Sequence, residues 1–325
     1  MQETNLYWAV YLNLEDEVLN ITKYIHCDSS QKNVYSIAIA DLIVRCAIEI
    51  EAISKIIYKN LGGDMEPKDD KGNNRFLFFD SDCLALIDKT YNIAKKKVII
   101  SSTAFFLDDS DRIIRPLKES HKMGQGNGCK WKDAYQALKH DRYDNLSKYG
   151  TVFNLIHALA ALFILNLYLK DERYDLPDGI FDERVGSKVF SVIAYKADNL
   201  QVDGKKFNDS YINKPNGITL EESLYIIKLL DSNYTDMFNA FITDNKETIK
   251  RILESRTIRD FLAQHPNYEI KHPLSLITDA EGDQAVKKYL SIREFSQQIK
   301  IKKREAILNK GTAIYPEISN DDFSL

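Results

Sequence analysis

The sequence predicts a mainly α-helical fold, with a helical bundle over residues 1–170 and an appended C-terminal region over residues 171–325 that is mostly helical with a minor β component. Two observations support this. Apolar residues recur at helical spacing through the first half. Residues 152–169 are apolar on all sides, which is typical of a helix buried within a bundle.

The first half divides into helices separated by polar or irregular segments. Gly62 and Gly63 end the longest helix, and Asp80 is a plausible N-cap for the next one. The β-branched residues 97–102 indicate either a short strand or a buried connector. The expected helices cover residues 14–25, 34–61 and 81–95, with a short helix from residue 131 and a long one from residue 151.

The second half changes character after residue 170. Residues 171–182 are polar and contain Pro177 and Gly179, which favours a boundary there. Residues 187–195 are strand-like, and residues 201–217 are rich in turn-forming residues. Helices are expected again at residues 220–230, 234–255 and 285–308.

Composition limits the class of protein. The formal net charge of −4 gives no global attraction to nucleic acid, so any such site must be a local patch. The four cysteines lack pairing or metal-ligand spacing, which favours reduced thiols in a cytoplasmic protein. The N-terminus does not resemble a signal peptide. The apolar segment contains Asn154, His157 and Asn166, so we expect it to be buried in the protein and not in a membrane.

The most informative chemistry is the run Lys139, His140, Asp141 and Arg142. It places two cations, a carboxylate and an imidazole within one helical turn or a tight corner. Such groups can bind a phosphate and transfer a proton near neutral pH. The alternative is a structural corner, in which the charges form surface ion pairs and the histidine lies at a helix end.

A second pattern lies on the expected helix 34–61. Its charged residues fall within an arc of about 160° when projected at 100° per residue. One interpretation is a solvent-facing stripe, and the other is that Glu51, with Lys55 beside it, faces the corner at residues 139–142. The stripe consists of Asp41, Arg45, Glu49, Glu51, Lys55 and Lys59.

Three segments together resemble the HEPN-like superfamily: Glu51 with Lys55, residues 131–142, and residues 154–165. The resemblance covers about residues 10–170 and implies an α-helical bundle, commonly dimeric. Many members are metal-independent RNA-cleaving toxins or phage-defence proteins. Their signature is an arginine followed a few residues later by a histidine. His140 matches the histidine, and Tyr135 occupies the position of the arginine.

The resemblance implies roles for these residues. His140 would transfer the proton of an RNA 2′-hydroxyl, Lys139 and Arg142 would anchor the phosphate, and Glu51 or Asp141 would orient the imidazole. Other arginine–histidine pairs at similar spacing rank lower. They are Arg259 with His265 and Arg115 with His121. His157 lies among apolar residues and is expected to be a hydrogen-bonded core histidine.

A basic run near the C-terminus is a second candidate RNA-binding surface, together with Lys139 and Lys55. The alternative is the solvated face of a peripheral helix. The candidate residues of the run are Lys300, Lys302, Lys303 and Arg304.

Two functions therefore remain open. One is a HEPN-like intracellular RNA-associated protein that acts as a metal-independent endoribonuclease of toxin or phage-defence type. The other is a catalytically silent helical module for dimerisation or protein interaction. The sequence has no P-loop or dinucleotide fingerprint, so no cofactor and no metal are expected. The expected partners are RNA, a second copy of the chain and an unidentified protein.

Overall fold

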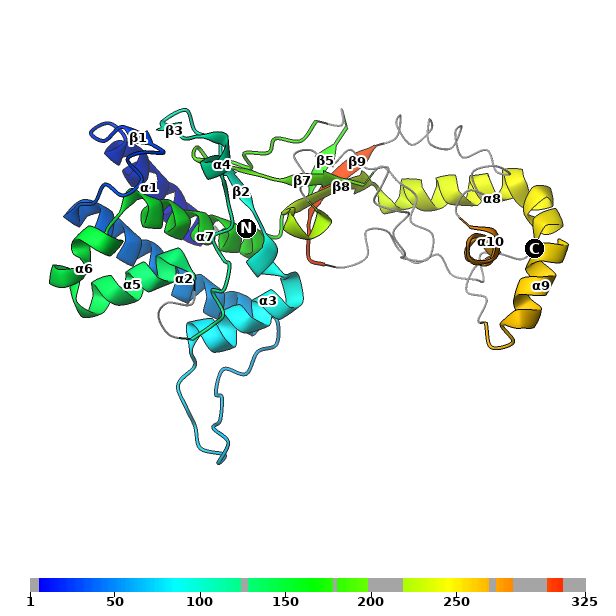
Figure 1. The fold of residues 1–325 in the computed structure, drawn as a ribbon, viewed down its shortest axis with the longest axis horizontal. Coiled ribbons are helices and arrows are strands. Elements are labelled where there is room, and N and C mark those ends of the chain that lie inside the picture. Colours follow the sequence, from blue (N-terminus) through cyan, green and yellow to red (C-terminus); the bar gives the residue numbers. More distant parts are fainter. Residues whose placement is uncertain are drawn as a thin grey trace.

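A computed structural model of the protein describes residues 6–123, 128–177, 180–197, 219–268, 273–282 and 303–311. These residues form a mixed α/β fold with three small sheets (Figure 1). The prediction of a mainly α fold is therefore wrong. Residues 225–229 and 304–308, which the sequence pattern assigned to helices, are instead paired strands. Most of their side chains are buried, and the pairing with distant strands outweighs local helix propensity.

Three helices of the first half, at residues 6–21, 37–60 and 130–140, pack around α7 (Val152–Lys170), whose apolar side chains are nearly all buried. Thr151 caps this helix, because its side chain accepts a hydrogen bond from the Asn154 N–H. By length and composition α7 could cross a membrane, but 89% of its most apolar window is buried in the fold. The other helices of this layer are α1 (Leu6–Ile21), α2 (Ile37–Asn60), α3 (Ala85–Tyr91), α4 (Asp109–Arg112), α5 (Lys130–His140) and α6 (Arg142–Tyr149).

A π-helix, η1 (Phe79–Leu84), precedes α3, and a 3₁₀ turn, η2 (Ile93–Lys95), follows it. The expectation that Asp80 caps a helix here is wrong, because Asp80 lies within the π-helix and Phe78 precedes it. The Asp80 side chain instead accepts a hydrogen bond from the buried Lys132 amine.

Three small sheets accompany the helical layer, and the second of them joins it to residues beyond 170. β1 (Cys27–Asp28) pairs with β3 (Phe105–Phe106) in parallel. β2 (Val98–Ile100) lies between β4 (Ile113–Ile114) and β6 (Phe190–Val192), so residues 97–102 contain the strand that was one of the two expectations. The third sheet has the order β5 (Tyr174–Leu176), β9 (Arg304–Leu308), β8 (Tyr225–Leu229) and β7 (Ala194–Lys196).

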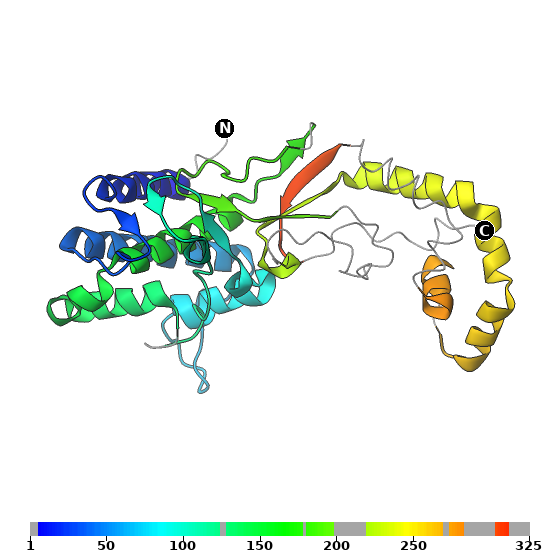
Figure 2. The same ribbon diagram turned by 45° about the horizontal axis from the view of Figure 1, so that its top comes forward.

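An arm of three helices extends from the third sheet, away from α1–α7 (Figure 2). α8 (Asp231–Leu253) confirms the helix expected at residues 234–255 and is followed by α9 (Arg256–Gln264) and α10 (Pro273–Glu281). The prediction of a helix at residues 220–230 is wrong, because these residues form a 3₁₀ turn, η5 (Leu220–Glu222), followed by the strand β8. Most of the helix expected at residues 285–308 lies outside the described residues, and its last five residues form β9.

The predicted division at residue 170 stays a prediction. Residues beyond it return to the helical layer, since β6 pairs with β2 and Glu15 of α1 accepts hydrogen bonds from the main-chain N–H groups of Lys188 and Val189. The polar boundary segment is therefore followed by residues that pack with the first half.

Candidate functional site

The run at residues 139–142 forms a corner between two helices. α5 ends at His140 and α6 begins at Arg142. Asp141 sits between them as the N-cap of α6, and its carboxylate accepts a hydrogen bond from the Asp144 N–H at 3.2 Å. This carboxylate is therefore used to start a helix, which is the structural role that the alternative interpretation expects.

His140 and Arg142 do not converge within one chain. His140 is exposed and has no hydrogen-bond or ion-pair partner among the described residues. Arg142 Nη1 donates to Asp41 Oδ1 at 2.5 Å, which joins the corner to the exposed face of α2. The stripe does supply a carboxylate to the corner, but the contacting residue is Asp41.

Glu51 instead lies beside Tyr135, the residue at the position where the HEPN-like signature has its arginine. Burial, and then the negative charge of Glu51, raise the pKa of Tyr135. Lys139 Nζ lies 3.4 Å from the Tyr135 hydroxyl, to which it donates, and 5.3 Å from the centre of its ring. Tyr135 thus fills the space between Glu51 and Lys139, and Lys55 is exposed one turn further along α2.

Ion pairs on the stripe run between helices. Arg45 Nη1 lies 2.6 Å from Glu17 Oε2 of α1, and Arg142 pairs with Asp41 as described above. An open groove between α1 and α2 lies beside both pairs. It is lined by Glu17, Asn20, Ile21, Ala38, Asp41, Leu42, Val44 and Arg45.

The basic run near the C-terminus is only partly described. Lys300 and Lys302 lie outside the described residues. Lys303 is exposed, and Arg304 is the first residue of β9. The described part of this run is therefore an extended segment leading into a sheet.

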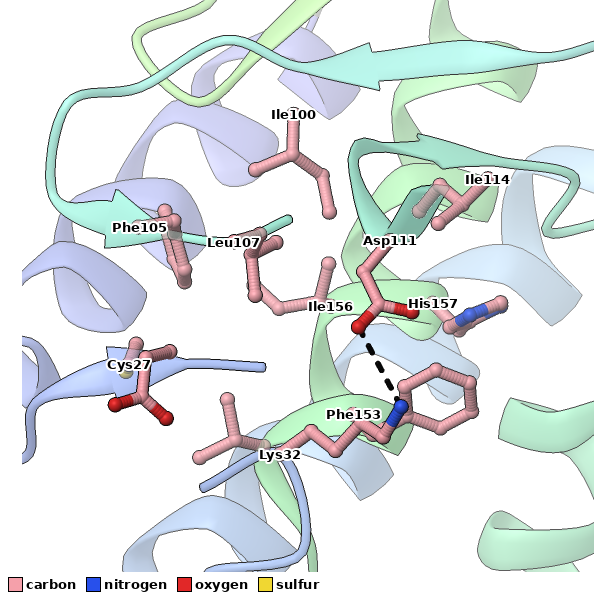
Figure 3. Close-up of a pocket in the computed structure, with 12 residues that line it drawn as sticks. Cys27, Lys32, Ile100, Phe105, Leu107, Asp111, Ile114, Phe153, Ile156 and His157 are labelled. Atoms are coloured by element: carbon pink, nitrogen blue, oxygen red, sulfur yellow. Dashed lines mark hydrogen bonds and ion pairs between the residues drawn. The ribbon is translucent and has the colours of Figure 1, made fainter. Parts of the chain in front are cut away.

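A small pocket that no sequence pattern predicts lies between α7, β2 and the β1–β3 pair (Figure 3). Its volume of about 30 Å³ holds about two water molecules. Lys32 reaches across it, with Nζ 3.4 Å from Asp111 Oδ2. The remaining walls are mostly apolar and come from segments far apart in the chain, so no local sequence pattern marks the pocket.

His157 is a core histidine, as expected, but it is not hydrogen-bonded at Nε2, which is buried without a partner. Burial, with a smaller contribution from Lys130, lowers the pKa of His157 to about 4. The ring is therefore neutral at pH 7. It packs against Phe153 with 4.4 Å between ring centres.

The other arginine–histidine pairs differ from each other. His265 Nδ1 lies 2.9 Å from the Phe261 carbonyl oxygen, and Arg259 donates to the Glu254 carbonyl. His121 Nδ1 instead lies 3.5 Å from the carboxylate of Asp88. All four cysteines are buried and free, and the described residues contain no group of three potential ligands placed to hold a metal ion.

Comparison with known proteins adds no further information. No protein-family model matches the chain, and neither the curated proteins nor the solved structures contain a match to it.

Proposed function

We propose that the helical layer is a catalytically silent self-association module, in which two copies of the chain pair through the exposed face of α2. This α2 face consists of Ile37, Asp41, Val44, Arg45, Ile48, Glu51, Ala52 and Lys55. Its two isoleucines are unusually open for a helix whose opposite side is in the core, with Ile37 63% and Ile48 50% exposed. Exposed apolar residues on one helix face favour burial against a partner.

The order of charges on the α2 face supports a second copy as the partner. Suppose that two copies of α2 pair antiparallel about a two-fold axis that passes at Ile48. A residue a given number of positions before Ile48 in one copy then lies opposite the residue the same number of positions after Ile48 in the other copy. Arg45 then shares a level with Glu51, and Asp41 shares one with Lys55. Val44 likewise meets the level of Ala52. These three pairings are favourable, and Ile37 reaches the level of Lys59, so the central part of the face, from residue 41 to residue 55, is complementary to itself.

The surroundings of His140 support the silent form of this function. A histidine base needs a group that orients its ring and cations that bind the phosphate. Within one chain the cation Arg142 is bound to Asp41, and Glu51 is beside Tyr135. His140 is left without either partner among the described residues.

The self-association is tested with Ile48→Asp in sedimentation-velocity experiments over a concentration series. We expect the dimer dissociation constant to rise at least about tenfold, since a buried unpaired carboxylate at the axis costs more than 1.4 kcal/mol. Ile180→Asp is the matched control, because Ile180 is 80% exposed and lies elsewhere. A monomeric wild type, or equal weakening by both variants, contradicts the proposal.

RNA cleavage is tested separately. Wild type and His140→Ala are incubated with total RNA and tRNA in EDTA, and we expect neither to produce specific fragments. Cleavage by the wild type that is lost in His140→Ala would contradict the silent module and support the HEPN-like ribonuclease.

A further inference from the structure

The pocket between α7, β2 and the β1–β3 pair has an apolar interior and one side that faces solvent. Lys32 and Asp111, whose side chains are 42% and 30% exposed, form the solvent side (Figure 3). The volume of about 30 Å³ gives room for about two to three non-hydrogen atoms. The interior walls are side chains that are at most 7% exposed: Ile100, Phe105, Ile114, Val152 and Ile156.

The polar groups of the wall differ in whether the protein already bonds to them. Lys32 and Asp111 are paired with each other, at 3.4 Å between Nζ and Oδ2. The Asp28 carboxylate accepts hydrogen bonds from main-chain N–H groups of its own turn, and the Cys27 thiol donates to a nearby carbonyl. Among the buried side-chain nitrogen and oxygen atoms of the described residues that line the pocket, His157 Nε2 is the one without a partner. Buried polar atoms are almost always hydrogen-bonded, so this nitrogen is available to a molecule that enters the pocket.

The chemistry of the wall favours a neutral guest with one hydroxyl group. An ion would lose its hydration in an apolar interior whose charged side chains are already paired. A buried water makes roughly three hydrogen bonds, whereas the described side chains of the wall offer it the single free nitrogen of His157. The His157 ring is neutral at pH 7, so Nε2 donates or accepts according to the tautomer. A hydroxyl group can accept or donate, so it fits both tautomers.

We propose that this pocket binds a short-chain alcohol of about two carbon atoms. The alkyl part packs against the apolar walls, and the hydroxyl group bonds to His157 Nε2. The alcohol enters when the partly exposed ion pair of Lys32 and Asp111 opens, which costs little for a pair in contact with solvent. A ligand of about three non-hydrogen atoms binds no tighter than about 0.5 mM, so the site responds to alcohol at millimolar concentrations. The pocket is independent of the α2 face, because none of its residues belongs to that face.

The experiment follows the ¹³C methyl signals of Ile100, Ile114 and Ile156 and the imidazole ¹⁵N signals of His157 by NMR. The folded wild type is titrated with ethanol, and separately with xenon, an apolar probe of similar size that has no hydroxyl group. We expect saturable methyl shifts with ethanol, accompanied by a shift of the His157 Nε2 signal. Methyl shifts that do not saturate with ethanol, or a saturable response to xenon alone, overturn the proposal.

Three variants separate the hydrogen bond from the shape of the pocket. His157→Phe keeps an aromatic ring without its nitrogens and is expected to weaken ethanol binding about fivefold, the value of one neutral hydrogen bond, without weakening xenon binding. Val152→Leu narrows the pocket and should weaken the binding of both probes. His140→Phe is the matched control at an exposed histidine and should change neither affinity. Equal ethanol affinity of wild type and His157→Phe, or unchanged binding in Val152→Leu, overturns the proposal.

Discussion

At the scale of single residues, Glu15 is a buried carboxylate that accepts four hydrogen bonds. It is 0% exposed, and its carboxylate accepts hydrogen bonds from the Tyr11 hydroxyl at 2.7 Å and from the Ser187 hydroxyl at 2.5 Å. The N–H groups of Lys188 and Val189 also donate to it, at 3.0 and 3.1 Å. One side chain thus joins α1 to the start of β6.

Glu15→Gln should destabilise the protein by about 2–4 kcal/mol, because one carboxylate oxygen is replaced by an amide that donates where an acceptor is needed. Urea denaturation followed by circular dichroism measures the free energy of unfolding. The control is Asp16→Asn, which affects only an exposed ion pair with Lys188 and should cost less than about 1 kcal/mol. Equal costs for the two variants would contradict the role of Glu15.

The burial of the His157 ring should make the free energy of unfolding depend on pH. Its folded-state pKa of about 4 lies below the value of about 6.5 in an unfolded chain. The stability that comes from burying the neutral ring is fully present above pH 6.5. It is lost as the pH falls towards 4, because in this range the unfolded chain takes up a proton on His157 and the folded chain does not. At pH 5 the loss is about 2 kcal/mol.

The measurement compares the free energy of unfolding of wild type and His157→Gln at pH 7 and pH 5. We expect the wild type to lose more stability than the variant over this interval. Parallel losses in the two proteins would show that His157 does not account for the pH dependence.

At the scale of elements, the sequence predicted the helices α2, α7 and α8 and the strand character of residues 187–195, offered a strand as one alternative at residues 97–102, and missed β8 and β9. α2 has apolar residues at helical spacing and α7 is a long run that is apolar on all sides, and both signals depend on the element alone. β8 and β9 are five residues each, and they pair with one another across about eighty residues of chain, as in the register of Tyr225 with Leu308. A short apolar run does not reveal such a partner, so both were assigned to helices.

The candidate site was predictable to a similar extent. Local sequence placed Lys139–Arg142 near a helix end, because ionisable residues follow an apolar pattern there. The partner of Arg142 is Asp41, 101 positions away, and the stripe offered several equivalent carboxylates. Which of these carboxylates contacts Arg142 depends on how α5 packs against α2. The sequence pattern of one helix carries no information on that packing.

The α2 face also predicts the effect of exchanging charges. Lys55→Asp should weaken the dimer about fivefold, because symmetry places the new carboxylate opposite Asp41 twice in each dimer. Adding Asp41→Asn should restore part of the affinity, because it removes the opposing carboxylate, although it also removes the ion pair of Asp41 with Arg142. Sedimentation equilibrium at low salt measures the dissociation constants. Failure of the double variant to recover would argue against an axis at Ile48.

At the scale of the whole molecule, Asn309 connects the third sheet to the helical layer. Its side-chain amide donates to the carbonyl of Leu220 at 2.6 Å and to the carbonyl of Ser223 at 3.1 Å. The main-chain carbonyl of Asn309 accepts a hydrogen bond from the Tyr168 hydroxyl of α7 at 2.8 Å. Three distant parts of the chain therefore meet at one residue.

Asn309→Ala should destabilise the protein by about 1–3 kcal/mol, since it leaves the buried Ser223 carbonyl without its side-chain donor, while the Leu220 carbonyl still accepts hydrogen bonds from the Ser223 N–H and hydroxyl. Amide hydrogen exchange should show the largest loss of protection in β8 and β9. Lys310→Ala is the neighbouring control. It removes an ion pair with Asp171 and should cost less than about 1 kcal/mol. A uniform loss of protection across α2 and α7 would contradict a local role for Asn309.

The position of β9 has a consequence for the order of events during synthesis. β9 is the last strand described in the chain, yet it lies between β5 and β8. While the ribosome is still making the residues before 304, both of those strands have an open edge that a strand from another molecule can occupy. The third sheet is complete only after residue 308 has left the ribosome. Until then, two nascent chains of this protein that meet can pair through these open strand edges and aggregate.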